Sequence, residues 1–174
     1  MTTIRRITSP NDAPREALAA LLSDVVDGGA SIGFLSPLAE AEALAYWDGV
    51  LGALGPGLAL WVAEGEAGQA VGTVQLAPCL KPNGRHRAEV QKLQVHPAAR
   101  GLGLASRLMA EVEAHALRAG IRLLVLDTEA GSTAERVYAQ LGWQRTGEIP
   151  DYALTPDGRP HATAVWFKRL AAPA

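Results

Sequence analysis

A glycine-containing turn between a strand pattern and a helix pattern is the most constraining feature of this 174-residue chain. Residues 91–106 read QKLQVHPAARGLGLAS, and apolar residues at helical spacing follow them as far as Ala119. The first amides of a helix have no partner inside the helix, and glycines let such a turn approach a ligand closely. The helix dipole and the charge of Arg100 favour an anion there. The turn therefore predicts a pyrophosphate site on the amides from Arg100 to Ser106.

The spacing of the glycines separates the ligand classes that could use this turn. A P-loop needs Lys-Ser/Thr after its last glycine, and this pair is absent. A dinucleotide-binding fold needs a third glycine where Ser106 stands, and its turn follows the strand directly. Asp127, which we expect to end the next strand, lies about where that fold has its ribose-binding acid. A small dinucleotide-binding oxidoreductase is therefore an alternative, although too little chain follows for further βαβ units.

The whole chain alternates strand and helix patterns, which predicts one mixed α/β domain over residues 1–174. Residues 87–95 alternate polar and apolar side chains with one slip in register, which indicates a strand with a β-bulge. The apolar run at 122–127 is typical of a strand covered on both faces. We expect strands at 3–8, 59–64, 70–76, 87–95, 122–127, 143–149 and 162–170, and helices ending at Gly28, at 37–54, within 100–119 and at 132–141.

Charge and composition exclude several functions. Sixteen Lys and Arg against eighteen Asp and Glu give a net charge of −2, so extended nucleic-acid binding is not expected. The single cysteine, Cys79, rules out an internal disulfide and a cysteine-based zinc site, and the four histidines do not fall at HExxH spacing, so we expect no metal. The N-terminus has no apolar signal region and no apolar run could span a bilayer, which predicts a cytoplasmic protein without membrane contact.

The run QVHPAARGLGLA resembles the signature of the GNAT acyltransferases, [Q/R]-x-x-G-x-[G/A], with Arg100, Gly103 and Ala105 at the matching positions. The runs GASIGFL, VGTVQL, HRAEVQKLQVHPAARG, LLVLDT and GEIPDYALTPDG extend the resemblance to the tabtoxin-resistance-like acetyltransferases. The resemblance implies a single GNAT-like α/β domain of α+β type. Its mixed central sheet would have about six or seven strands and about four flanking helices, with two parallel neighbouring strands splayed at the cofactor site.

The resemblance also implies a reaction. Acetyl-CoA would be the co-substrate, and the acceptor would be a primary amine of a small molecule, such as a toxin or antibiotic-like amine. Transfer would be direct, within a ternary complex, and two copies of the chain could form a homodimer. A catalytically silent acyl-CoA-binding sensor is the alternative from another functional class.

The cofactor residues implied by the resemblance lie on one strand, the turn and the following helix. The backbone of Leu93, Gln94 and Val95 would pair with the pantetheine arm, and one of these amides could polarise the thioester carbonyl. Ser132 either contacts the cofactor or, with Glu135, forms a capping box, which the spacing favours. The pyrophosphate would lie on Arg100, Gly101, Leu102, Gly103, Leu104, Ala105 and Ser106, with Leu102 and Leu104 anchoring the turn to the core.

Three side chains are candidates for proton transfer. Tyr138 would protonate the departing CoA thiolate, and its alternative is a role as an amphipathic core residue. Asp127 would accept the proton of the attacking amine, or else bond the loop amides at 128–131. Glu89 is the rival base, and its alternative is a surface-edge residue paired with Arg87 or Lys92. The cofactor contact of Tyr138 would be at the sulfur.

Overall fold

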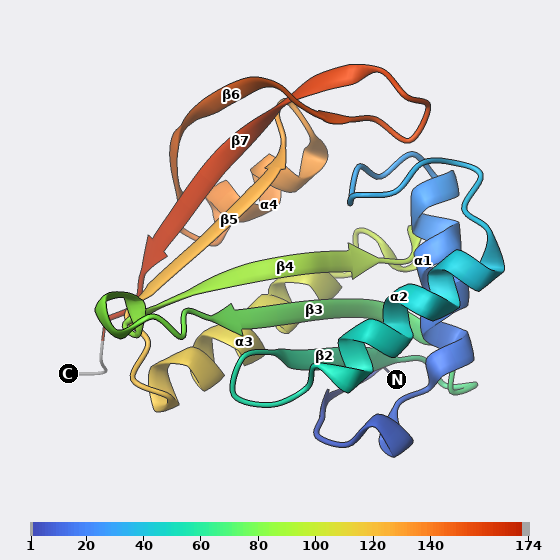
Figure 1. Ribbon diagram of the computed structural model, residues 1–174, viewed down its shortest axis with the longest axis horizontal. Coiled ribbons are helices and arrows are strands. Elements are labelled where there is room, and N and C mark those ends of the chain that lie inside the picture. The colour runs from blue at the N-terminus through green and yellow to red at the C-terminus, as the bar shows by residue number, and fades with distance from the viewer. Residues whose placement is uncertain (1, 172–174) are drawn as a thin grey trace.

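Seven strands and four helices make up residues 2–171, which the computed structural model describes (Figure 1). The strands are β1 (Thr3–Ile7), β2 (Ala59–Glu64), β3 (Ala70–Pro78), β4 (Arg87–Val95), β5 (Leu123–Glu129), β6 (Gln144–Leu154) and β7 (Pro160–Arg169). The helices are α1 (Arg15–Asp27), α2 (Glu40–Gly52), α3 (Leu104–Arg118) and α4 (Thr133–Gln140), and short 3₁₀ turns lie at Pro10–Asp12, Pro82–Gly84 and Pro97–Ala99.

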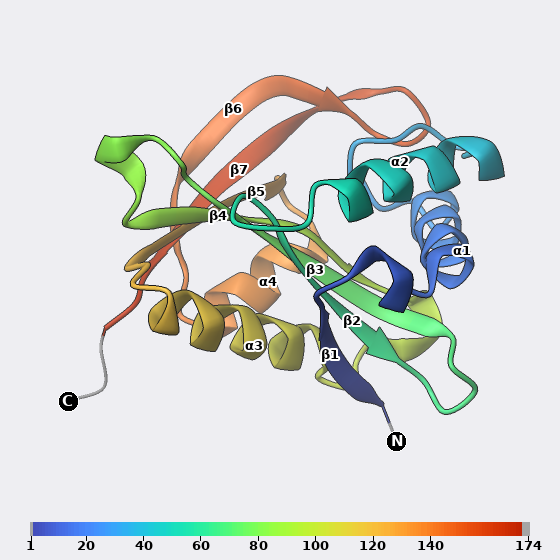
Figure 2. The same cartoon turned by 60° about the horizontal axis from the view of Figure 1, so that its bottom comes forward.

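All seven strands belong to one sheet, in the order β1-β2-β3-β4-β5-β7-β6. Only β4 and β5 run parallel, and the other neighbours are antiparallel. Helices cover both faces, with α1 and α2 on one side and α3 on the other (Figures 1 and 2). The expected mixed sheet with one parallel pair is therefore confirmed.

Alternation along the central strands builds a core on each face of the sheet. In β2, Leu60 and Val62 belong to the cluster under α1 and α2, whereas Trp61 belongs to the cluster under α3. Successive strand residues point to opposite faces, so a strand buried on both sides becomes continuously apolar. The amphipathic helix α3 closes its face with Leu108 and Val112, both fully buried.

The parallel pair separates soon after it begins. Only Arg87, Ala88 and Glu89 of β4 pair with β5, opposite Leu123–Val125. Beyond Glu89, β4 stays on β3 whereas β5 continues on β7 as far as Glu129, so the two strands diverge (Figure 1). The remainder of β4 thus has one side without a strand neighbour, as the predicted splay requires.

A bulge interrupts β4 where the sequence pattern slips. Thr73 pairs with Gln94 but Gln75 pairs with Gln91, so Lys92 and Leu93 together face one residue of β3. Lys92 has φ 49°, in the left-handed region that non-glycine residues seldom occupy. The predicted bulge is confirmed, and it lies directly before the segment expected to meet a ligand.

Several expected boundaries were wrong. The strands expected at 143–149 and 162–170 are longer and form one hairpin, because β6 runs through Pro150 to Leu154. An edge strand tolerates proline since its outward amide has no ladder partner, and a register shift with a positive φ at Asp151 absorbs the irregularity. Helix α2 begins at Glu40 rather than 37, after an extended Ala39. Strand β5 extends two residues beyond Asp127, because β7 keeps pairing with it.

Candidate functional site: a cleft between the parted strands

The divergence of β4 and β5 opens a cleft of about 940 Å³. Four parts of the chain line it: the end of α1 with the following loop, β4 with the glycine turn, β5 with the start of α4, and the β6–β7 hairpin. Among its lining residues are the candidates Glu89, Leu93, Gln94, Val95, Arg100, Gly101, Gly103, Leu104, Ala105, Ser106, Asp127, Ser132 and Tyr138. The structure therefore brings together every candidate except Leu102.

The glycine turn presents free amides to this cleft. Gly101 and Gly103 have φ of 76° and 72°, and a Cβ at either position would meet no atom within 4 Å. Glycine is therefore required by the left-handed backbone and not by crowding. Within the described residues, the amides from Gly101 to Ser106 have no hydrogen-bond partner. The Arg100 amide differs from the expectation, because it donates to the carbonyl of Pro97 at 3.3 Å.

The two leucines of the turn behave differently. Leu104 is buried in the α3 core, as expected, but Leu102 is 75% exposed and anchors nothing. A positive φ on each side of Leu102 turns its side chain outward. The Arg100 side chain lies back on the strand, where its Nε donates to the carbonyl of Val95 at 3.3 Å.

Ser132 does not cap α4 in the expected way. It occupies the N-cap position, but its side chain makes no capping bond, and its buried hydroxyl has no partner within the described residues. Glu135 accepts a hydrogen bond from the Gly131 amide at 2.7 Å instead of reaching back to Ser132. The capping box is therefore wrong, and the Ser132 hydroxyl is left beside the cleft.

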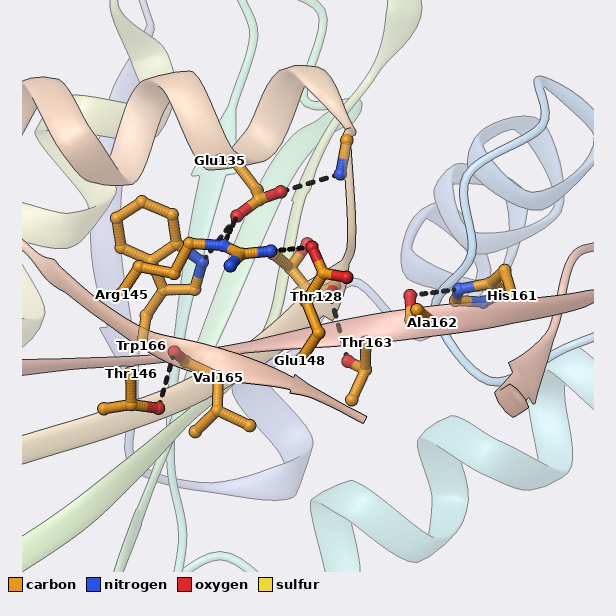
Figure 3. A network of polar contacts seen from close by, with 11 residues as sticks. Thr128, Glu135, Arg145, Thr146, Glu148, His161, Ala162, Thr163, Val165 and Trp166 are labelled. Carbon is orange, nitrogen blue, oxygen red and sulfur yellow. Dashed lines mark hydrogen bonds and ion pairs between the residues drawn. The ribbon is translucent and has the colours of Figure 1, made fainter. Parts of the chain in front are cut away.

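Glu135 instead joins three elements at the start of α4 (Figure 3). Its carboxylate accepts the Gly131 amide, Arg145 Nε at 2.9 Å and Trp166 Nε1 at 3.0 Å. Partial burial acts to raise the pKa of Glu135, but the hydrogen bond from Gly131 and the contacts with Arg145 outweigh it, so the pKa lies below its ordinary value. This network ties the first turn of α4 to β6 and β7.

Tyr138 lies one turn further along α4, where it is buried in the core and also lines the cleft. The ring packs near Trp143 and Trp166, at centroid distances of 5.9 and 6.3 Å. Burial, and secondarily the charge of Asp127, raises the pKa of the phenol. Tyr138 thus combines the core position and the cleft position that the sequence left as alternatives, and its phenol stays protonated at neutral pH.

The two carboxylate candidates occupy the wall of the cleft. Glu89 is half-buried at the last paired position of β4, where the strands part. Asp127 is exposed and accepts a hydrogen bond from Thr163 Oγ1 at 3.0 Å. Its predicted position at the end of the strand, bonding the following loop, was wrong because β5 continues past it. Both carboxylates face the same cleft.

Other lining residues were missed in the sequence. The loop between α1 and α2 (residues 28–39, the α1–α2 loop) contributes Ser31, whose Oγ lies 2.8 Å from His161 Nε2. The amide of Ser36 in this loop donates to Pro156 O at 2.8 Å, next to the β6–β7 hairpin (Figure 1). Lys92, on the bulge, also lines the cleft. The register slip marked its position, but nothing in the pattern indicated its neighbours.

Residues 2–171 contain neither a cluster of metal ligands nor a membrane-spanning helix. Within residues 2–171 no three His, Cys, Asp or Glu side chains gather closely enough to hold a metal ion. In the same part of the chain, no helix has the length and apolar content needed to cross a membrane.

These features define a class of α/β proteins in which two neighbouring parallel strands part beside a turn of free amides at the start of a helix, a turn of the kind that can bind an anion. The family model of the acetyltransferase (GNAT) domain matches residues 56–145 of this chain. An uncharacterized N-acetyltransferase from the hisH-hisA intergenic region of Azospirillum brasilense is 33% identical over 127 residues, which are 72% of this chain and 74% of that protein. The chain belongs to the GNAT acetyltransferase family, and it is an N-acetyltransferase.

Solved structures share the fold over nearly the whole chain. A ribosomal-protein-alanine N-acetyltransferase from Brucella melitensis is 25% identical with a TM-score of 0.76, over 97% of this chain and 99% of that one. A phosphinothricin acetyltransferase from Sinorhizobium meliloti, solved with acetyl-CoA, is 20% identical with a TM-score of 0.77, over 97% and 88%. The single GNAT-like domain expected from the sequence is confirmed by this likeness.

Proposed function

We propose that this protein transfers the acetyl group of acetyl-CoA to a primary amine of a small molecule, by direct attack within a ternary complex. One observation carries the proposal: the unpaired side of β4 and the free amides from Gly101 to Ser106, which follow it after one 3₁₀ turn, line the same cleft. An extended pantetheine arm would occupy the missing strand position, and the pyrophosphate would lie on the amides.

The reaction needs few groups from the protein. The nitrogen of a neutral amine attacks the thioester carbonyl carbon, the carbon–sulfur bond breaks, and the products are an amide and CoA. A backbone amide among Leu93–Val95 would stabilise the carbonyl oxygen as it becomes negative. Tyr138 would deliver a proton to the sulfur, and Glu89 or Asp127 would take the proton that the amine releases.

The class of acceptor follows from likeness and charge. The tabtoxin-resistance-like runs in the sequence, and the shared fold with a phosphinothricin acetyltransferase, support a toxin or antibiotic-like amine. A net charge of −2 agrees with a small molecule and not with a nucleic acid.

A homodimer is also proposed, through the exposed side of β6. This long edge strand carries Ile149, Tyr152 and Leu154, which are 45%, 56% and 49% exposed. An edge strand with apolar side chains is a ready surface for a second copy. Light scattering during size-exclusion chromatography should give twice the mass of one chain, and a monomer at high concentration would contradict the proposal.

Initial-rate kinetics test the transfer step. Thiol release is measured while acetyl-CoA and an accepting amine are varied together. Intersecting double-reciprocal lines are expected for a ternary complex, whereas parallel lines would indicate a covalent acetyl-enzyme and overturn direct transfer. Release of CoA that depends on an amine also excludes a silent sensor.

The choice between the two bases has its own test. Glu89→Gln and Asp127→Asn are compared for kcat/KM with one amine at one pH. Loss of the true base should lower kcat/KM about 100-fold or more, and the other variant should stay within about 10-fold of the wild type. A fall of less than about 10-fold in both variants would show that neither carboxylate takes the proton.

A further inference from the structure

Lys92 is a half-buried ammonium on the acceptor side of the cleft, away from the glycine turn. Its Nζ donates to the carbonyl of Ile32 in the α1–α2 loop. It also lies 5.6 Å from the ring centroid of Phe34 and 6.0 Å from that of Tyr46. Both aromatic rings attract a cation through their π faces. The ammonium is thus held at one place although the lysine side chain is long.

The loop is shaped around this ammonium. A Cβ at Gly33 would lie 3.0 Å from Lys92 Nζ, and Gly33 has φ 95°. The loop therefore passes the ammonium at a distance that only glycine allows without displacing it. Ile32 and Gly33, like Lys92, line the cleft.

The Lys92 ammonium has more hydrogen-bond donors than the Ile32 carbonyl uses. Lys92 carries three N–H donors, and the carbonyl of Ile32 accepts one of them. No ion pair joins Nζ to a carboxylate in the part of the chain that the structure describes. Burial lowers the pKa of Lys92, while the charges of Asp127 and Glu89 act to raise it. A partly dehydrated cation without an ion-pair partner gains most from an anion that enters beside it.

We infer that Lys92 binds a carboxylate carried by the acceptor, so that the preferred acceptor is an amino acid or a similar amine with an anionic group close to the nitrogen. The inference rests on the proposed transfer to a small amine. Glu89 and Asp127 supply negative charge in the same cleft for the ammonium form of the amine, and Lys92 supplies positive charge for its carboxylate. A zwitterion matches both signs, whereas a simple amine leaves Lys92 without a partner.

The first experiment measures binding and needs no turnover. A panel of L-amino acids and matched amines that lack only the carboxylate, such as L-leucine with isopentylamine, is titrated calorimetrically into the CoA-bound protein. At least one amino acid should bind about 10- to 100-fold more tightly than its matched amine. Equal binding within every pair, or no binding by the whole panel, overturns the inference.

Variants then assign the preference to Lys92. Lys92→Met keeps an unbranched side chain on the bulge and removes the charge, so the preference for the carboxylate should fall to about one. Lys92→Arg should retain part of it, and Lys81→Met, at an exposed turn, should keep all of it. A preference that survives Lys92→Met overturns the inference, and so does an equal loss of binding for both members of a pair.

Acetyl-CoA binding separates this inference from the proposed function. The same Lys92→Met sample is titrated with acetyl-CoA, and its affinity should match that of the wild type. Unchanged acetyl-CoA binding with no effect on the carboxylate preference refutes only the role of Lys92. Failure of the wild-type protein to bind acetyl-CoA refutes the proposed function itself.

Discussion

Tyr138 illustrates how a single side chain can belong both to the core and to the site. Its ring is held by Trp143 and Trp166, so the phenol has little freedom, while the cleft lies at its edge. Tyr138→Phe keeps the ring and removes only the hydroxyl. If the phenol protonates the leaving thiolate, turnover should fall about 100-fold with acetyl-CoA affinity unchanged. Thiol release and calorimetry measure the two quantities.

A matched control is available at Tyr46. Its hydroxyl accepts a hydrogen bond from Gln75 Nε2 at 2.9 Å and does not line the cleft. Tyr46→Phe should therefore cost some stability but leave turnover near the wild-type value. Turnover that is equal in Tyr138→Phe and wild type, under conditions where chemistry limits the rate, would remove the phenol from the mechanism.

The raised pKa of Tyr138 makes a separate prediction about pH. Because burial and the charge of Asp127 shift this pKa above its ordinary value of 10.0, the phenol stays protonated up to at least that pH. The ratio of wild-type to Tyr138→Phe turnover should therefore be constant from pH 7 to about 9.5. A ratio that declines with an apparent pKa below 9 would show that the phenol titrates earlier than its surroundings indicate.

Gly103 tests the amide turn. Its φ of 72° is strained for a β-branched residue, so Gly103→Val should reshape the turn at a stability cost of about 1–2 kcal/mol. Acetyl-CoA binding, measured by calorimetry, should be lost while circular dichroism shows a folded protein. Gly147→Val, at an uncrowded position on β6 where φ is not positive, is the matched control. Normal binding by Gly103→Val would refute the assignment of the turn.

For individual residues, the sequence predicted the free backbone amides better than the contacts of side chains. The run from Arg100 to Ser106 indicates free amides because glycine and helix starts have local consequences. Ile32, which accepts from Lys92, and Trp166, which donates to Glu135, lie 60 and 31 positions away along the chain, so no local pattern could show these contacts. The outward side chain of Leu102 likewise depends on the two left-handed glycines beside it.

The helix α4 is the element whose placement matters most for the site, since it carries Ser132 at its cap and Tyr138 on its inner face. It is only eight residues long, too short to be stable alone, so its position depends on tertiary contacts. Glu135 supplies two of these, through Arg145 on β6 and Trp166 on β7, and it also accepts the amide of Gly131 directly before the helix (Figure 3). The network therefore positions Tyr138 without touching a substrate.

Removing the charge of Glu135 should weaken this element. Glu135→Gln is expected to lower the free energy of unfolding by about 1–3 kcal/mol. The neutral amide is a weaker acceptor than the carboxylate, and it leaves part of this hydrogen-bond network unsatisfied. Urea unfolding followed by circular dichroism measures the change. Glu111→Gln, on the exposed face of α3, should change stability by less than about 0.5 kcal/mol.

The same carboxylate predicts an acid dependence. The folded-state pKa of Glu135 is depressed, so its stabilising contribution is present above the ordinary pKa of 4.5 and is lost as pH falls through the lower folded value. The stability difference between wild type and Glu135→Gln should therefore be constant at neutral pH and shrink below about pH 4.5. A difference that grows on acidification would contradict the depressed pKa.

The sequence predicted the bounds of a strand correctly where local signals are strong. The prediction was wrong where pairing with a neighbouring strand decides how far the strand extends. The bounds of β2 and β4 are as predicted, because alternation and flanking turns delimit them. The hairpin of β6 and β7 was predicted too short, since the prolines at 150 and 160 read as loop residues. Proline is tolerated in an edge strand and at the first residue of a strand. The sequence alone does not show which strand lies at the edge or at which residue a strand begins.

At the scale of the whole molecule, the strand order could not be derived from periodicity. The neighbours β4 and β5 are separated by a turn and all of α3, and nothing local says that they pair for three residues and then part. The predicted splay came from the family resemblance and not from the pattern. The order of the sheet also disfavours a dinucleotide-binding fold, because that fold needs several parallel strands and this sheet has one parallel pair.

A ligand that bridges the parted strands should stabilise the entire fold. Acetyl-CoA would contact β4, the turn before α3 and the wall formed by β5 and α4, so it binds only the folded chain. At a concentration 100 times its Kd, such a ligand adds about 2.7 kcal/mol to the free energy of unfolding. For a chain of this size, that corresponds to a rise in Tm of about 5–10 °C.

Differential scanning calorimetry should show this rise with acetyl-CoA and none with NADH or NADPH. A rise with the nicotinamide cofactors alone would indicate that the free amides serve a dinucleotide, and the acetyl-CoA assignment would then fail.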